Sequence, residues 1–136
     1  MRIMSIDYGE KRTGIAVSDE NEILASAVTV ITESDPIMAA QKCVKCFKEI
    51  KADEIVLGLP KNMDGSLGFR ANKTIEFSKL LQSFLPDTNI VFLDERLTTK
   101  EAIQYMNITN TRGKKRKQTI DALAAKIILQ NYLDSK

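Results

Sequence analysis

The first twenty residues, MRIMSIDYGEKRTGIAVSDE (1–20), decide the fold that the rest of the chain can complete. An apolar run over residues 2–7 ends on Asp7, a turn with Gly9 follows, and a second apolar run covers residues 13–19. This pattern predicts two antiparallel strands with a tight connection. A carboxylate at the very end of a strand is either a solvent-exposed charge without a role or part of a functional site. Gly9 would let the backbone turn sharply and approach a ligand.

The following residues alternate between strand and helix patterns. Residues 23–31 (ILASAVTVI) are rich in Val, Ile and Thr, which predicts the third strand of an antiparallel meander. The later elements are predicted at residues 34–51 (helix), 54–60 (buried strand), 68–86 (helix), 89–96 (buried strand), 98–107 (helix) and 117–134 (helix). Strands joined by helical crossovers run parallel, so we expect one α/β domain over residues 1–136. Its mixed five-stranded sheet should have three antiparallel strands followed by two parallel ones, with helices on both faces.

The composition, with 43% apolar and 28% charged residues, is typical of a soluble globular protein. No apolar run approaches the roughly 20 residues of a membrane helix, and the N-terminus lacks signal-peptide features. We therefore expect a cytoplasmic protein without membrane contact. The chain contains no histidine, which excludes Ser-His and Cys-His catalysis. Any hydrolysis must use carboxylates, lysines or metal ions.

Cys43 and Cys46 form a C-x-x-C pattern in QKCVKCFKEI. A zinc or redox site is one interpretation, but the chain has neither a second such pair nor a histidine to complete four zinc ligands. Both cysteines also follow the apolar spacing of the helix predicted at residues 34–51, where Cys packs as a small hydrophobic residue. We therefore expect a structural pair.

Three carboxylates occupy positions from which they could act together. Asp7 ends the first strand, Glu95 follows the last apolar strand, and Asp121 lies one turn into the final helix, beside alanines that would let this helix approach the sheet closely. The carboxyl ends of parallel strands form the edge where α/β proteins bind ligands. Converging carboxylates need a cation between them, and oxygen ligands favour Mg²⁺ or Mn²⁺, which activate water in phosphodiester cleavage. The helix dipole offers Asp121 a purely structural role instead.

A basic segment, TRGKKRKQ, precedes the final helix. It holds five positive charges in six residues, which leaves −3 for the rest of a chain whose net charge is +2. These residues are Arg112, Lys114, Lys115, Arg116 and Lys117. Gly113 and the mutual repulsion of the charges predict a mobile connection that binds a polyanion near the metal edge, although a solvated surface loop has the same composition.

Four motifs in order resemble the YqgF family of ribonuclease H-like proteins. They are DYGEKRTGIAVSD (7–19), GLPKNMDGSLGFRA (58–71), FLDERLTT (92–99) and RKQTIDALAAKIILQNYL (116–133). Proteins of this family are described as Holliday junction resolvases and as pre-16S rRNA nucleases. The resemblance covers nearly the whole chain. It implies the ribonuclease H-like fold, metal-dependent cleavage of a nucleic-acid backbone and a role in ribosomal RNA maturation.

The resemblance also implies that Asp7, Glu95 and Asp121 are the catalytic acids and the metal ligands. One feature departs from the wider superfamily, in which the fourth strand often carries an acid beside the first strand. Here that strand, EIVLGLP, ends without one. Glu95, one strand further on, would take its place, which changes the expected geometry of the metal site.

Two connections at the carboxyl edge are expected to contact phosphates. The first is the turn after Asp7, with Lys11 and Arg12. The second is GLPKNMDGSLGFRA, where Gly58, Gly65 and Gly68 would allow close approach of the backbone.

Strand alternation sends Asp94 to the face opposite Glu95, where it could pair with Arg96 or touch substrate. Together with the basic segment, the residues expected to bind nucleic acid are Lys11, Arg12, Lys61, Arg70, Lys73 and Arg96.

Three other interpretations stay open. An Asp-x-Gly turn between strands also holds phosphates in actin-like and sugar-kinase ATPases, which need two such domains around a nucleotide. A non-catalytic nucleic-acid-binding protein could keep the same fold. The substrate could also be four-way DNA instead of an rRNA precursor. Junction resolvases act as dimers because the junction has two-fold symmetry. Nothing in this sequence specifies a dimer interface, so we expect a monomer or a weak homodimer.

Overall fold

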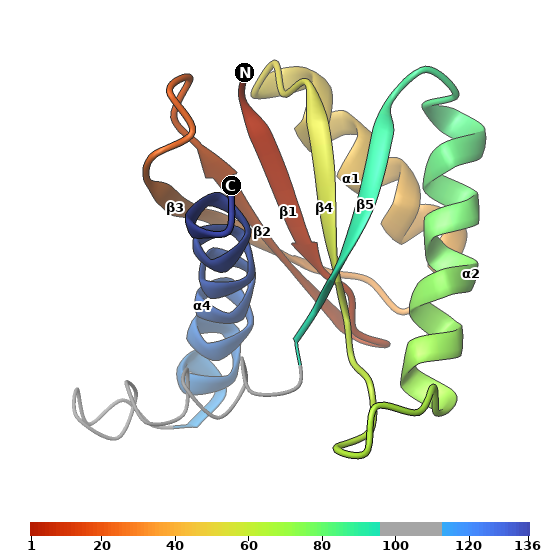
Figure 1. Cartoon of the computed structure of the whole chain (residues 1–136). Helices are drawn as coiled ribbons and strands as arrows, with labels where there is room; N and C mark the ends of the chain where they lie inside the picture. The colour runs from red at the N-terminus through yellow and green to blue at the C-terminus, as the bar shows by residue number, and fades with distance from the viewer. Residues whose placement is uncertain (96–112) are drawn as a thin grey trace.

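Five strands form one mixed sheet, with helices on both of its faces (Figure 1). The computed structural model describes residues 1–95 and 113–136, and of residues 113–121 it describes the backbone alone. The strands in these ranges are β1 (Ile3–Asp7), β2 (Arg12–Ser18), β3 (Ala25–Thr32), β4 (Glu54–Leu59) and β5 (Asn89–Asp94). The helices there are α1 (Pro36–Glu49), α2 (Phe69–Phe84) and α4 (Gly113–Asp134).

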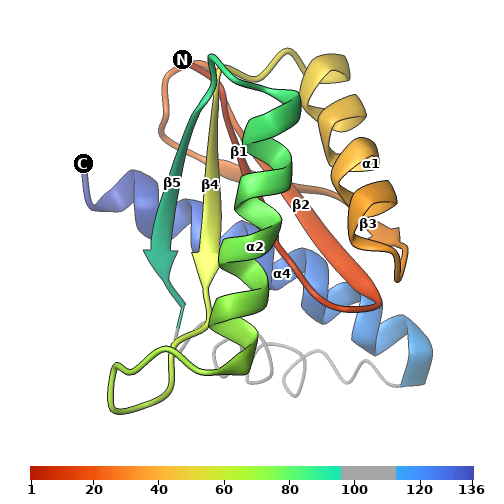
Figure 2. The ribbon, with the colours of Figure 1, turned by 90° about the vertical axis from the view of Figure 1, so that its right-hand side faces the viewer.

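The strands lie in the order β3-β2-β1-β4-β5. β2 pairs antiparallel with both β1 and β3, whereas β4 pairs parallel with both β1 and β5. The predicted sheet, an antiparallel meander followed by two parallel strands, is confirmed. β1, β4 and β5 therefore end at one carboxyl edge, which is the lower edge in Figure 2.

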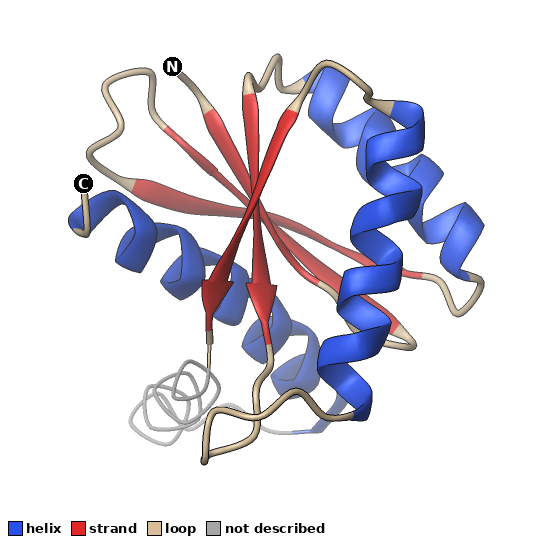
Figure 3. Ribbon diagram, turned by 45° about the vertical axis from the view of Figure 1, so that its right-hand side comes forward, coloured by secondary structure: helices blue, strands red, loops and turns tan. Residues whose placement is uncertain are grey.

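Alternation along β1 divides the core into two parts. Met4 and Ile6 belong to the cluster under α1 and α2, whereas Ile3 belongs to the cluster under α4. Ser5, on the same face as Ile3, donates a hydrogen bond from its hydroxyl to the carbonyl oxygen of Ala125 in α4 (2.6 Å). The backbone of α4 thus lies close to the sheet, as its alanines predicted. Figure 3 shows α4 on one face of the sheet and α1 with α2 on the other.

Helix α1 follows its sequence signals closely. The carboxylate of Asp35 caps it by accepting a hydrogen bond from the backbone N–H of Met38 (3.4 Å), and Pro36 occupies its first turn. Cys43 is buried and Cys46 is half-buried, and both are free thiols. Burial raises the pKa of both thiols above the ordinary value. A raised thiol pKa disfavours the nucleophilic thiolate at neutral pH, and the burial of Cys43 in the core agrees with a structural pair.

Two predicted elements differ from the observed ones. β5 was expected to be buried, but it forms an edge of the sheet, and Phe92 is 43% exposed. An apolar run does not reveal whether a further strand will cover it. α4 begins at Gly113, four residues before the predicted start, so residues 113–116 belong to this helix and not to the connection before it. Lys and Arg are good helix formers and extend a helix that packing holds further along the chain.

The helix predicted at residues 98–107 lies outside the described residues. Among the helices that the structure does describe, none is both long enough and apolar enough to cross a membrane.

Candidate active site

The carboxyl edge of the sheet brings two of the three predicted acids into contact. Asp7 is the last residue of β1, and Glu95 follows β5, with its backbone N–H donating to the carbonyl oxygen of Leu59 (3.2 Å). Alternation along each strand directs both side chains to the face covered by α4. A hydrogen bond joins the two carboxyl groups. Asp94 is exposed and Glu95 is buried, so the predicted split between these neighbours is confirmed.

The contact between Asp7 and Glu95 crosses β4 at Gly58. Leu57 pairs with Ile6, so Gly58 lies level with Asp7. A Cβ atom at residue 58 would collide with the carboxylate of Glu95. Glu95 can therefore reach across β4 only because residue 58 has no side chain, and it occupies the place that an acid on β4 would otherwise fill.

Gly58 consequently has a different role from the one expected. It lies inside β4, and the close approach that it permits is that of Glu95 and of Ile128 in α4, whose Cδ1 would be 2.5 Å from a Cβ at residue 58. Gly9 also differs in part: it makes the sharp turn possible, but its Cβ position is blocked by the carbonyl of Arg12 and is not open to a ligand. A glycine within a buried apolar strand was the available signal, since such glycines often mark a close approach.

The environment of Glu95 favours its protonated form. The residue is 7% exposed, and burial together with the negative charge of Asp7 and their hydrogen bond raises the pKa of the Glu95 carboxyl from 4.5 to about 9. Asp94 adds to this effect, whereas the guanidinium of Arg70 opposes it. Ionisation of both carboxyl groups would therefore place two negative charges side by side at a largely buried position.

Helix α4 brings the third predicted acid towards the same edge. Asp121 lies four residues before Ala125, which accepts the hydrogen bond from Ser5, and Asp7 lies two residues after Ser5. α4 runs opposite to β1 (Figure 1), so both steps lead from the Ser5–Ala125 contact towards the carboxyl edge. Each step covers about 6–7 Å. Position 121 therefore lies at the level of Asp7. It is more than two turns from the start of α4, which removes the helix-dipole explanation for this acid, because that effect is confined to the first turn.

The side chain of Asp121 is outside the described part of the structure. Among the side chains inside it, no three acids, cysteines or histidines are grouped to hold a metal. The Asp7–Glu95 pair fits a hard divalent cation, because both ligands offer only oxygen and because a cation would relieve the repulsion that keeps Glu95 protonated.

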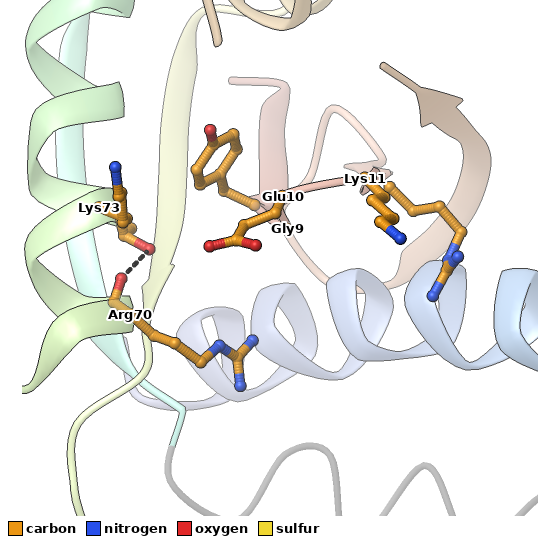
Figure 4. A pocket seen from close by; sticks show the side chains of 8 residues that line it. Gly9, Glu10, Lys11, Arg70 and Lys73 are labelled. Carbon is orange, nitrogen blue, oxygen red and sulfur yellow. Dashed lines mark hydrogen bonds between the residues drawn. The ribbon is translucent and has the colours of Figure 1, made fainter. Parts of the chain in front are cut away.

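A basic cavity of about 410 Å³ opens beside the carboxyl pair, between the β1–β2 turn and the start of α2. Figure 4 shows Arg70 and Lys73 on the α2 side of this cavity and Lys11 on the side of the turn, with the carboxylate of Glu10 between them. Its lining residues are Tyr8, Gly9, Glu10, Lys11, Arg12, Arg70, Lys73 and Thr74. Four residues predicted separately from two distant motifs thus line one cavity. Sequence reasoning missed Glu10, which is a single surface acid with no pattern around it.

Arg70 connects the cavity with the carboxyl pair. It lines the cavity and also lowers the pKa of Glu95 through its charge. Lys61 follows β4 and is not among the cavity residues. Arg96 and Arg112 lie outside the described residues, and Lys114, Lys115, Arg116 and Lys117 belong to the first turns of α4, where only the backbone is described.

Solved structures share this fold. The chain matches the fowlpox virus resolvase in complex with Holliday junction DNA with a TM-score of 0.64 and 13% identity, over 99% of this chain and 98% of that one. It matches the Thermus thermophilus RuvC protein in complex with a Holliday junction substrate with a TM-score of 0.61 and 13% identity, over 99% and 94% of the two chains. At such low identity these matches establish the ribonuclease H-like fold.

Sequence relatives are much closer. A protein of Acetivibrio thermocellus is 42% identical over all of this chain and 97% of its own length, and one of Halothermothrix orenii is 44% identical over 98% of this chain and 95% of its own. Both are provisionally named as pre-16S rRNA nucleases. The model of the RuvX family, described as Holliday junction resolvase, matches residues 1–135. The resemblance seen in the motifs is thereby confirmed, and the chain belongs to the RuvX (YqgF) family.

Proposed function

We propose that this protein is a metal-dependent nuclease that hydrolyses phosphodiester bonds in structured nucleic acid, and that residues 1–136 act as one nuclease domain. The observation that carries the proposal is the contact between Asp7 and Glu95 across Gly58, at the carboxyl edge of the sheet. Membership of the RuvX family supports the same reaction class.

Asp7, Glu95 and Asp121 would hold Mg²⁺ or Mn²⁺. An ion of this kind supplies the positive charge that activates a water molecule and stabilises the leaving oxygen. The three residues themselves have to lose their protons and to stay oriented towards one another. Burial keeps the Glu95 carboxyl in place beside Asp7, and the small residues of α4 let position 121 come close to the sheet.

The basic cavity would bind the phosphates that flank the scissile bond. Lys11, Arg70 and Lys73 carry charges that suit a polyanion, and Arg70 lies between this cavity and the carboxyl pair. With the neighbouring phosphates bound in the cavity, one phosphate of the nucleic acid would lie at the acids. Arg96, Arg112 and the basic start of α4 would add further positive charges along the path of the nucleic-acid backbone.

The substrate that we propose is the precursor of 16S rRNA, cleaved during maturation of its 5′ end in the cytoplasm. The names of the relatives support this assignment. The alternative is four-way DNA, which the description of the family and the complexes of the two solved resolvases favour. Two-fold symmetric DNA junctions require a dimer, so the oligomeric state in solution helps to separate the two substrates.

One experiment compares both substrates directly. Purified protein with Mg²⁺ or Mn²⁺ is incubated with structured precursor RNA and with four-way DNA in parallel, and the products are sized. Asp7→Asn should abolish cleavage while the variant stays folded, because Asn keeps the shape and loses the charge. Asp53→Asn is the matched control, since Asp53 lies at the opposite edge of the sheet and is exposed. Equal cleavage by wild type and Asp7→Asn would disprove the site, and no cleavage of either substrate by the wild type would disprove the activity.

A further inference from the structure

The loop between β4 and α2 exposes three large apolar side chains. Met63 is 71% exposed, Leu67 is 51% exposed and Phe69, the first residue of α2, is 66% exposed. Single exposed apolar residues are ordinary on protein surfaces. Here three of them follow closely along one connection, from the loop into the first residue of α2, next to a candidate catalytic centre, and such local concentrations of apolar side chains often mark interaction sites.

Hydrogen bonds within this loop define the conformation of its backbone. The backbone N–H of Gly65 donates to the carbonyl oxygen of Asn62 (2.8 Å), and the N–H of Asn62 donates to that of Ser66 (2.9 Å). Asp64 accepts from both the N–H (2.9 Å) and the hydroxyl (2.6 Å) of Ser66. Gly68 packs against the side chain of Asn62, where a Cβ would be 3.0 Å from Oδ1. These hydrogen bonds restrain the backbone of the loop, which lowers the conformational entropy that its apolar side chains would lose on binding a ligand.

The place and the charges of the loop indicate what it contacts. It leaves the sheet at Leu59, whose carbonyl accepts the hydrogen bond from Glu95, and it extends beyond the carboxyl edge (Figure 2). Lys61 lies on the loop, and the ammonium of Lys73 lies over the ring of Phe69, 5.3 Å from its centre. Apolar side chains beside cations suit a ligand whose flat apolar groups are attached to phosphates.

We propose that Met63, Leu67 and Phe69 form a base-contacting surface, on which unpaired bases next to the scissile phosphate are stacked. Phe69 would stack a base while Lys73 meets the phosphate of the same strand. The inference rests on the proposed nuclease function and deepens it. It assigns as substrate a nucleic acid with unpaired nucleotides at the cleavage point, whereas a fully paired duplex would leave this surface uncovered.

The test measures binding without cleavage. A fluorescein-labelled RNA hairpin with a short single-stranded tail, and the same hairpin with an abasic tail, are titrated in EDTA at several salt concentrations. Phe69→Ala should weaken binding to the first probe about tenfold or more and leave binding to the abasic probe nearly unchanged. The slope of log affinity against log salt should not change, because no phosphate contact is lost. Phe69→Trp should restore affinity.

Phe84→Ala is the matched control, since Phe84 ends the same helix, is 40% exposed and lies far from the carboxyl edge. It should bind both probes like the wild type. Equal affinities of wild type and Phe69→Ala, or an equal loss of affinity for both probes, would overturn the inference. The first result would indicate that the apolar side chains bind a protein partner instead. Cleavage by the wild type with Mg²⁺ or Mn²⁺ is scored separately. If the wild type cleaves and Phe69→Ala changes neither binding nor cleavage, the base-contacting surface alone is disproved. If binding depends on the bases but the wild type does not cleave, the proposed activity is disproved.

Discussion

Replacing Glu95 with Gln tests whether the carboxyl pair is a site that needs a counter-ion. The pKa of Glu95 is about 9 in the folded chain, against an ordinary value of 4.5. Because the folded-state pKa is raised, the stabilisation that the protonated carboxyl provides is fully present below about pH 4.5. It is lost as the pH rises towards the folded-state pKa, so the metal-free protein should become less stable across the neutral range.

The size of this loss follows from the proton that folding must take up. In this window each pH unit costs up to about 1.4 kcal/mol of unfolding free energy. Between pH 5.5 and 7.5 the wild-type protein should therefore lose about 2–3 kcal/mol. Glu95→Gln stays neutral, and its amide can donate a hydrogen bond to Asp7. The variant should lack this loss and exceed the wild type at pH 7.5 by about 1–3 kcal/mol.

Urea unfolding followed by circular dichroism in EDTA, at several pH values in this range, measures the difference. Glu54→Gln is the matched control. Glu54 is also 7% exposed, but it lies at the other edge of the sheet and accepts a hydrogen bond from the hydroxyl of Tyr132 (2.8 Å). This control should keep the pH dependence that Glu95 produces. Parallel curves of stability against pH for wild type and Glu95→Gln would refute the reasoning.

Three further predictions concern the same edge. Gly58→Ala should lower the unfolding free energy by about 1–3 kcal/mol through overpacking and should reduce cleavage at least tenfold, since the new methyl group displaces Glu95; cleavage at the wild-type rate would contradict this. Mn²⁺ should raise the midpoint of thermal unfolding of the wild type at pH 7.5 and have much less effect on Glu95→Gln, and equal shifts would place the metal elsewhere. Changing Lys114, Lys115 and Arg116 to Ala should lower the slope of log affinity for RNA against log salt by up to roughly 2–3, whereas parallel lines would show that these residues touch no phosphate.

The sequence by itself determined the elements and the faces of the sheet. Apolar runs, short connections and helical crossovers predicted three antiparallel strands followed by two parallel ones, as the sheet shows. Strand alternation separated Asp94 from Glu95, and the apolar run before Asp7 placed that residue at a strand end. These features depend on residues that are close along the chain, where backbone geometry and side-chain direction repeat regularly.

Tertiary structure alone decided how these parts meet. The passage of Glu95 over Gly58 to Asp7 depends on the register of three strands and on the reach of one side chain. The meeting of Lys11 and Arg70 in one cavity depends on how α2 packs beside the β1–β2 turn. The raised pKa of Glu95 has the same origin, because burial and a neighbouring charge act through space and leave no local pattern in the sequence.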